Sequence, residues 1–197
     1  MNGTKLSADF NFDYYGEFYM KIDNKKARII LAVIIAVSLV ISTVYMFAKQ
    51  GFHEDELLTY NLANSSKQLN VDGGWNSPED FNEYLAVSPD DRFDYAQVYE
   101  NQIIDASHPP LYYALVHTVC SFFPSVFSKW LAYSINVLAM AGILIMLYKI
   151  GRKITGNNLY ALIGVGAYAL SIACITTTIY LRMYATLTFW VLAFVYL

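Results

Sequence analysis

The protein has 197 residues and a formal net charge of -3, and 56% of its residues are hydrophobic whereas only 15% are charged. This composition is far too apolar for an ordinary soluble domain of this length, so we expect a membrane protein with no nucleic-acid partner. The two cysteines, Cys120 and Cys174, both lie in apolar stretches. They are too few for a disulfide framework or a thiolate metal site, and we interpret them as packing residues.

The first membrane helix is predicted at residues 29–48, an uncharged stretch of about 20 residues that would span roughly 30 Å of hydrocarbon. A signal peptide would have a shorter apolar core, nearer the N-terminus, with a small-x-small cleavage site. Residues 1–28 form a polar tail that ends in a basic cluster. Positive charge on this side predicts a cytoplasmic N-terminus and a helix that leaves on the outer face.

Residues 49–124 are then predicted to form an extracytoplasmic loop with amphipathic helices. One helix is expected after Asn76 or Ser77 as N-cap, with Pro78 in the first helical position. A second is expected at 93–104, and a turn at 71–74.

The apolar stretch 109–123 is shorter than a span needs, so we expect a helix along the membrane interface with Ser107 as its N-cap. If this stretch crossed the membrane, the basic motif KIGRK at residues 149–153 would face outward, against the charge rule.

The rest of the chain is predicted to continue across the membrane. Residues 125–150 form the second span, 158–180 the third, and 184–197 the start of a fourth that stops before it is complete. We therefore expect an N-terminal fragment of a longer polytopic protein. No Asp or Glu follows Asp105, so carboxylate chemistry would come from the first outer loop.

This topology brings three polar features to the outer face: HEDE at 53–56, SHPPLYY at 107–113, and Arg182 with Tyr184. Ionisable residues beside a membrane span are candidate functional groups, although an arginine can also snorkel and tyrosines gather at interfaces. HEDEL begins like a zinc-protease motif, but Leu57 stands where the second histidine is required. We expect no cofactor and no metal site, although the many acids leave a divalent metal possible.

The order of these motifs resembles the membrane-embedded glycosyltransferases that use polyprenyl-phosphate-linked sugars, particularly the protein O-mannosyltransferase and lipid A aminoarabinose transferase group. The resemblance rests on the pair Asp55 and Glu56, on HPPLYY at 108–113 and on RMY at 182–184. It implies an all-α polytopic membrane protein with a GT-C-like helix bundle and interfacial helices in the first outer loop. It also implies a plasma-membrane location, a polyprenyl-phosphate sugar donor, and a protein, lipid or glycan acceptor.

The resemblance further implies roles for individual residues. Asp55, with Glu56 beside it, would be the catalytic carboxylate that takes a proton from the acceptor hydroxyl. The donor phosphate and lipid would be bound by His108, Tyr112, Tyr113, Arg182 and Tyr184. A non-catalytic lipid-binding or transporter-type subunit is the alternative, because it would place the same residue types at an interface.

Overall fold

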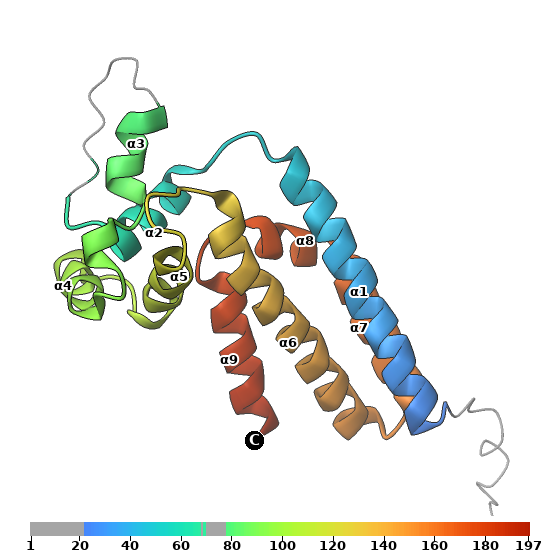
Figure 1. Ribbon diagram of the computed structural model, residues 1–197. Helices are drawn as coiled ribbons and strands as arrows, with labels where there is room; N and C mark the ends of the chain where they lie inside the picture. Colours follow the sequence, from blue (N-terminus) through green and yellow to red (C-terminus); the bar gives the residue numbers. More distant parts are fainter. Residues whose placement is uncertain (1–21, 68, 70–77) are drawn as a thin grey trace, which may run out of the picture.

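The computed structural model describes residues 22–67, 69 and 78–197 (Figure 1), and within these residues the chain is all-helical with no strand. Among the described residues, Pro89–Asp91 also form a 3-10 turn. In chain order the helices are α1 (Asn24–Ala48), α2 (Glu54–Asn64), α3 (Pro78–Leu85), α4 (Tyr95–Asp105), α5 (Leu111–Ser121), α6 (Lys129–Thr155), α7 (Asn158–Ala169), α8 (Ile172–Ile179) and α9 (Tyr184–Tyr196).

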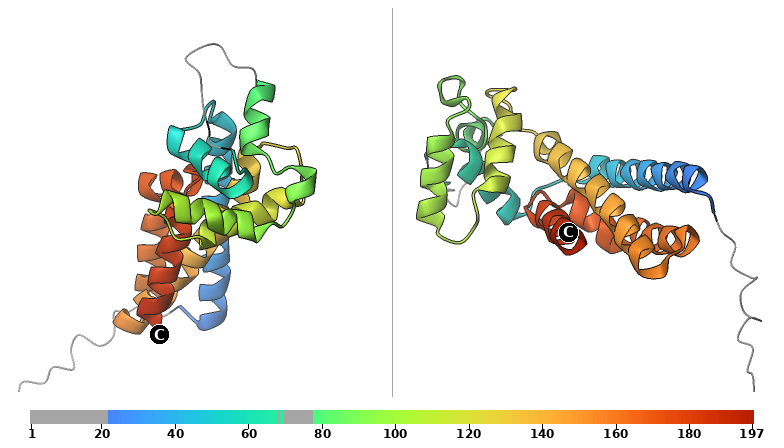
Figure 2. Two further views of the ribbon diagram at one scale, coloured as in Figure 1. Left: turned by 90° about the vertical axis from the view of Figure 1, so that its left-hand side faces the viewer. Right: turned by 90° about the horizontal axis from the view of Figure 1, so that it is seen from below.

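The helices form two groups, which we name the bundle (α1 and α6 to α9) and the cap (α2 to α5). Figures 1 and 2 show the cap at one end of the bundle, with the start of α1, the α6–α7 turn and the C-terminus at the other. In the bundle α6 packs against both α7 and α9, while α1 packs against α7 and α8. The polar groups of the cap therefore lie together at one end of the bundle.

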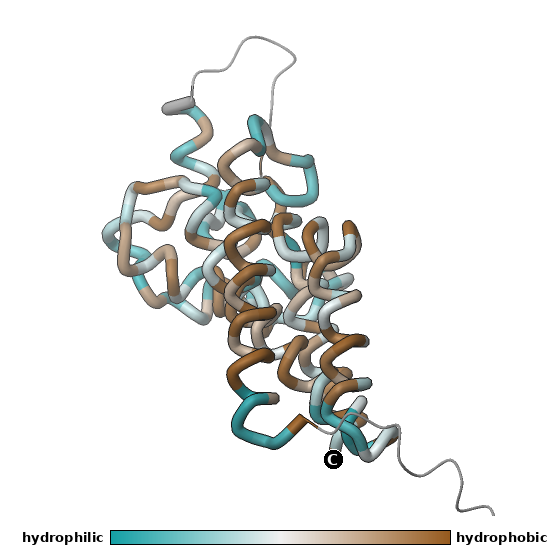
Figure 3. The backbone as a smooth tube through the Cα atoms, turned by 90° about the vertical axis from the view of Figure 1, so that its right-hand side faces the viewer, coloured by the Kyte–Doolittle hydropathy of each residue, from teal (hydrophilic) through white to brown (hydrophobic). Residues whose placement is uncertain are grey.

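Two helices of the bundle, α1 and α6, are long and apolar enough to cross a membrane. The bent pair α7 and α8 can supply a third crossing. Apolar residues predominate in the bundle, whereas polar ones are more frequent in the cap and at the far turn (Figure 3). Many large apolar side chains of the bundle are exposed. Because a surface of this kind is stable in hydrocarbon and not in water, this is a membrane protein with two or three candidate spans.

The two long helices begin and end at recognisable caps. The side chain of Asp23 accepts a hydrogen bond from the backbone N–H of Lys26, so α1 starts before the predicted residue 29. The side chain of Ser128 caps α6, which runs through the basic motif and ends at Gly156 in the left-handed conformation (φ 65°). A glycine adopts that conformation without steric cost. The second span is thus shifted toward the C-terminus relative to the predicted 125–150.

The third predicted span is helical but not continuous. Instead of one helix over 158–180, α7 and α8 meet at an angle of 58°. The hydroxyl of Ser171 accepts a hydrogen bond from the N–H of Cys174 and so starts α8, while Ser38 of α1 donates to the carbonyl of Ala169. These contacts satisfy backbone groups that the break exposes, and in hydrocarbon such groups need an internal partner.

The cap agrees with most of the sequence pattern. Helix α3 starts at Pro78 as predicted, and α4 covers Tyr95–Asp105 where 93–104 was expected. The predicted N-cap at Asn76 or Ser77 and the turn at 71–74 lie outside the described residues. The prediction that Ser107 caps α5 is wrong, because the helix begins after Pro110 without a side-chain cap. The hydroxyl of Ser107 instead donates to the carbonyl of Asp105.

Buried tyrosines join the cap to the bundle. The hydroxyl of Tyr60 donates to the carbonyl of Ser128 and accepts from the N–H of Ala132, at the start of α6. The hydroxyl of Tyr112 donates to Asn136 in the same helix. Because the hydroxyls of Tyr60 and Tyr112 both have partners across the junction, these bonds fix where the cap sits on the bundle.

Candidate functional site

The start of α2 directs two adjacent carboxylates in different directions. His53 is the N-cap, with its Nδ1 accepting from the N–H of Asp55, and Glu56 reaches back to the N–H of His53. This capping box fixes the rotamer of Glu56. Successive residues on a helix point about 100° apart, so Asp55 faces elsewhere.

Glu56 is completely buried, and its two oxygens are occupied. One pairs with the ammonium of Lys49 and also accepts from the N–H of Leu181 at 2.8 Å. The other accepts from the N–H of His53 at 2.8 Å. A fully buried carboxylate whose two oxygens are held by three donors has no direct access to a substrate. Through Leu181, the contacts of Glu56 tie α2 to the segment after α8.

Asp55, by contrast, retains 40% of its side-chain exposure. It lines a cavity of about 230 Å³ together with His108 and Arg182. One carboxylate oxygen, Oδ2, accepts a hydrogen bond from the hydroxyl of Tyr180 at 2.9 Å. Oδ1 has no hydrogen bond to any described residue, so the group is both oriented and accessible.

Arg182 supplies a buried positive charge to this cavity, with only 5% of the residue exposed. Its Nη1 donates to the backbone carbonyl of Asp55 at 3.1 Å, and its Nη2 donates to Nε2 of His108 at 3.1 Å. Its Nε is buried without a hydrogen-bond partner among the described residues. Within that part of the chain no carboxylate forms an ion pair with the guanidinium.

The end of α8 places Arg182 in the cavity. After Ile179 the chain leaves the helix, and Asn136 of α6 donates to the carbonyls of Thr178 and Tyr180 at 3.2 and 2.7 Å. These two bonds fix the short segment between α8 and α9. Arg182 therefore projects from a backbone that is held directly before it, by Asn136 and by Glu56 through Leu181.

His108 is held by Asp105, the last residue of α4. Ala106 adopts the left-handed conformation (φ 54°) and turns the chain back, so that Asp105 Oδ2 lies 2.8 Å from Nδ1 of His108. The same oxygen accepts from the N–H groups of Ser107 and His108. Burial raises the pKa of Asp105, but these hydrogen bonds outweigh it and hold the pKa below the ordinary aspartate value.

The three predicted tyrosines are placed differently, and none of them lines the cavity. Tyr112 is buried and its hydroxyl bonds to Asn136 at 3.2 Å. Tyr113 is buried beside His108, with ring centroids 6.1 Å apart and a hydroxyl that has no partner among the described residues. Burial raises the pKa of Tyr113 to about 12, so it stays a donor at neutral pH. Tyr184 is half-exposed and stacks on Tyr180.

Two residues of the site were not predicted from the sequence. Nothing in the sequence indicates a role for Tyr180 except that it lies two residues before Arg182. Asp105 could have been identified, because it is the last carboxylate in the chain and lies three residues before His108, within reach across a turn. That spacing would have been enough to propose the pair.

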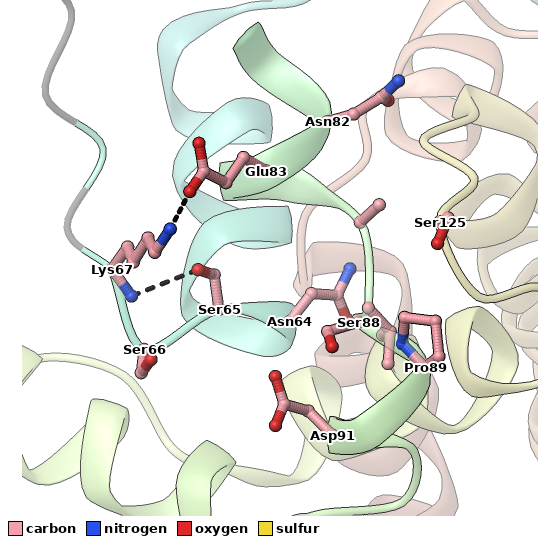
Figure 4. A pocket seen from close by; sticks show the side chains of 12 residues that line it. Asn64, Ser65, Ser66, Lys67, Asn82, Glu83, Ser88, Pro89, Asp91 and Ser125 are labelled. Atoms are coloured by element: carbon pink, nitrogen blue, oxygen red, sulfur yellow. Dashed lines mark hydrogen bonds and ion pairs between the residues drawn. The ribbon is translucent and has the colours of Figure 1, made fainter. Parts of the chain in front are cut away.

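A second, larger cavity of about 430 Å³ lies between α2, α3 and the segment after α3 (Figure 4). It shares Ser65, Ser66 and Lys67 with the first cavity, and Lys67 is paired there with Glu83. None of the predicted site residues lines it. Over the described ranges, no group of three or more His, Cys, Asp or Glu side chains could hold a metal ion.

Comparisons with known proteins add no relative: no family model, no curated protein and no solved structure matches this chain.

Proposed function

We propose that this membrane protein is a glycosyltransferase that moves a sugar from a polyprenyl-phosphate donor to an acceptor hydroxyl on the outer face of the membrane. The observation that carries the proposal is one cavity in which an accessible carboxylate, Asp55, lies beside a buried arginine, Arg182, that has no carboxylate partner among the described residues. Three motifs far apart in the sequence, around residues 55, 108 and 182, contribute to this cavity.

Arg182 suits the phosphate of such a donor. Burying a guanidinium without a counter-ion is costly, and the cost is offset when an anion binds beside it. Departure of the lipid phosphate leaves added negative charge on its oxygens, which a fixed cation stabilises in the transition state.

Asp55 suits the acceptor. In its charged form it takes the proton from the acceptor hydroxyl as that oxygen attacks the anomeric carbon; the new C–O bond forms and the bond to the lipid phosphate breaks. The hydroxyl of Tyr180 keeps one carboxylate oxygen in place, leaving the other to act as base. We assign this role to Asp55 alone, since both oxygens of Glu56 are occupied within the fold.

A non-catalytic lipid-binding or transporter-type subunit is the second candidate, and the buried Arg182 without a carboxylate partner in the described part of the chain also favours it. The two candidates differ at Asp55. A binding protein needs only the arginine, whereas a transferase needs an accessible base within the same cavity.

The test is turnover by purified protein in vesicles that contain a dolichyl or undecaprenyl phosphate sugar. Asp55→Asn is expected to lower kcat by at least about 100-fold while donor binding survives, because the amide cannot accept the proton. The matched control is Glu54→Gln, which changes the neighbouring exposed carboxylate and should keep turnover. Unchanged turnover in Asp55→Asn would sink the catalytic assignment of Asp55, whereas donor binding without turnover by the wild type would favour the binding protein.

A further inference from the structure

We infer that Asp105 and His108 form a positioning relay that presents Arg182 to the donor phosphate, with His108 acting as a neutral acceptor and not as a phosphate ligand. The inference rests on the proposed function, because it assigns the anion at Arg182 to the lipid-linked phosphate. It changes the role expected for His108 and adds Asp105 to the site.

Asp105 determines which nitrogen of His108 carries the proton. An ionised carboxylate only accepts hydrogen bonds, so the 2.8 Å contact between Oδ2 and Nδ1 requires a proton on Nδ1. In the neutral ring Nε2 then has a free lone pair. It lies 3.1 Å from Nη2 of Arg182, a group that can only donate. Both ring nitrogens are therefore occupied, and neither is left to bind phosphate.

The acceptors that hold Arg182 are uncharged. The backbone carbonyl of Asp55 holds Nη1, and the imidazole of His108 holds Nη2. A carboxylate in direct contact would orient the guanidinium equally well but would neutralise it before the donor arrives. A neutral ring between Asp105 and Arg182 orients the guanidinium and keeps the negative charge one side chain away.

Protonation of His108 would reverse this arrangement, because Nε2 would become a donor pointing at another donor. The charged or titratable groups facing the ring are Asp105 from α4, Arg182 from the segment before α9, Tyr113 from α5 and, across the cavity, Asp55 from α2. Lys67 also lines the cavity but is paired with Glu83. Phosphate binding should therefore weaken in acid by more than the titration of the ligand explains.

The experiment measures the affinity of the purified protein in detergent for farnesyl phosphate, a short isoprenyl monophosphate, at pH 7.5 and pH 5.5. At pH 7.5 His108→Ala and Asp105→Asn are expected to bind about ten-fold more weakly, the effect of losing one charge-assisted hydrogen bond. His108→Gln should bind like the wild type, because its amide can donate to Asp105 and accept from Arg182. Glu100→Gln, an exposed position on α4, is the matched control.

The comparison between the two pH values distinguishes a positioning role of His108 from a role only in the stability of the fold. Between pH 7.5 and 5.5 the wild type should lose more affinity than His108→Gln, whose side chain does not titrate. Equal losses, or full affinity in a folded His108→Ala, would overturn the relay. Binding that survives in His108→Ala and Asp105→Asn but is lost in Arg182→Gln would overturn the relay and leave the proposed donor site in place. Absence of binding by the wild type overturns the proposed donor site itself.

Discussion

Asp55 and Glu56 show how burial separates two neighbours of the same chemistry. The sequence indicates the pair but cannot rank its members, because a capping box and a catalytic carboxylate both suit the first turn of a helix. The structure makes Glu56 a buried partner of Lys49 and leaves Asp55 accessible in the cavity. The difference follows from helix geometry, which turns one side chain inward and the next toward the cavity.

The first prediction at this scale concerns Glu56. Glu56→Gln should lower the free energy of unfolding by about 3 kcal/mol, since it leaves the largely buried Lys49 without its counter-ion. Asp55→Asn should change it little, because that side chain is partly exposed. Thermal unfolding in detergent measures both, and Lys49→Met added to Glu56→Gln should recover part of the loss. Full stability together with lost turnover in Glu56→Gln would instead make Glu56 catalytic.

The pKa of Asp105 gives a pH-dependent prediction. Its folded-state pKa lies below the ordinary value, so the charged form stabilises the fold. That contribution is complete above the ordinary aspartate pKa and is lost as the pH falls through the lower, folded-state pKa. Asp105→Asn should therefore be less stable than the wild type near pH 7, and the difference should shrink in strong acid. Unfolding measured at several pH values checks this, and a difference that grows in acid would contradict it.

The sequence predicts the existence of helices better than their interruptions. Pro78 indicates the start of α3, and length alone shows that α5 cannot cross a membrane. The break between α7 and α8 has no proline or glycine at Leu170 and Ser171 to announce it. It depends on a hydrogen bond from Ser38, more than 130 residues away, which no local pattern reveals.

The candidate site, too, has features that the sequence predicts and features that depend on distant contacts. The meeting of Asp55, His108 and Arg182 around one cavity could be predicted, because the predicted spans would bring all three to one membrane face. The spacing of Asp105 and His108 in the sequence is enough to propose their pairing. The contact between Tyr180 and Asp55 could not be predicted, since it depends on how α8 ends. The direction of a side chain at a helix end depends on tertiary contacts, which a local sequence pattern does not contain.

Asn136 is the test at the level of elements, because it links α5, α6 and the end of α8. Its side chain donates to the carbonyls of Thr178 and Tyr180 and accepts from Tyr112, all in the interior. Asn136→Leu should cost about 2 to 3 kcal/mol of stability and weaken farnesyl phosphate binding, since the segment that carries Arg182 loses its anchor. Ser134→Ala, which removes only a bond within α6, is the control. Wild-type binding in Asn136→Leu would contradict the anchoring role.

At the scale of the whole molecule, the arrangement of charge predicts an orientation. The basic motif at residues 149–153 and the start of α1 lie at one end of the bundle, and the cap with most of the acidic residues lies at the other (Figures 1 and 3). Positive charge is retained on the cytoplasmic side of membrane proteins. We therefore expect the cap, and with it the candidate site, on the outer face.

Cysteine labelling in intact cells measures this orientation directly. Cys120 and Cys174 are fully buried, so the unmodified chain should react little with a membrane-impermeant maleimide. A cysteine at Glu100, exposed on the cap, should be labelled from outside, whereas one at Ile154, which is 78% exposed at the far end, should react only after permeabilisation. Neither change removes a basic residue, so the charge that determines the orientation is kept. The opposite pattern would put the cap in the cytoplasm and exclude an acceptor on the outer face.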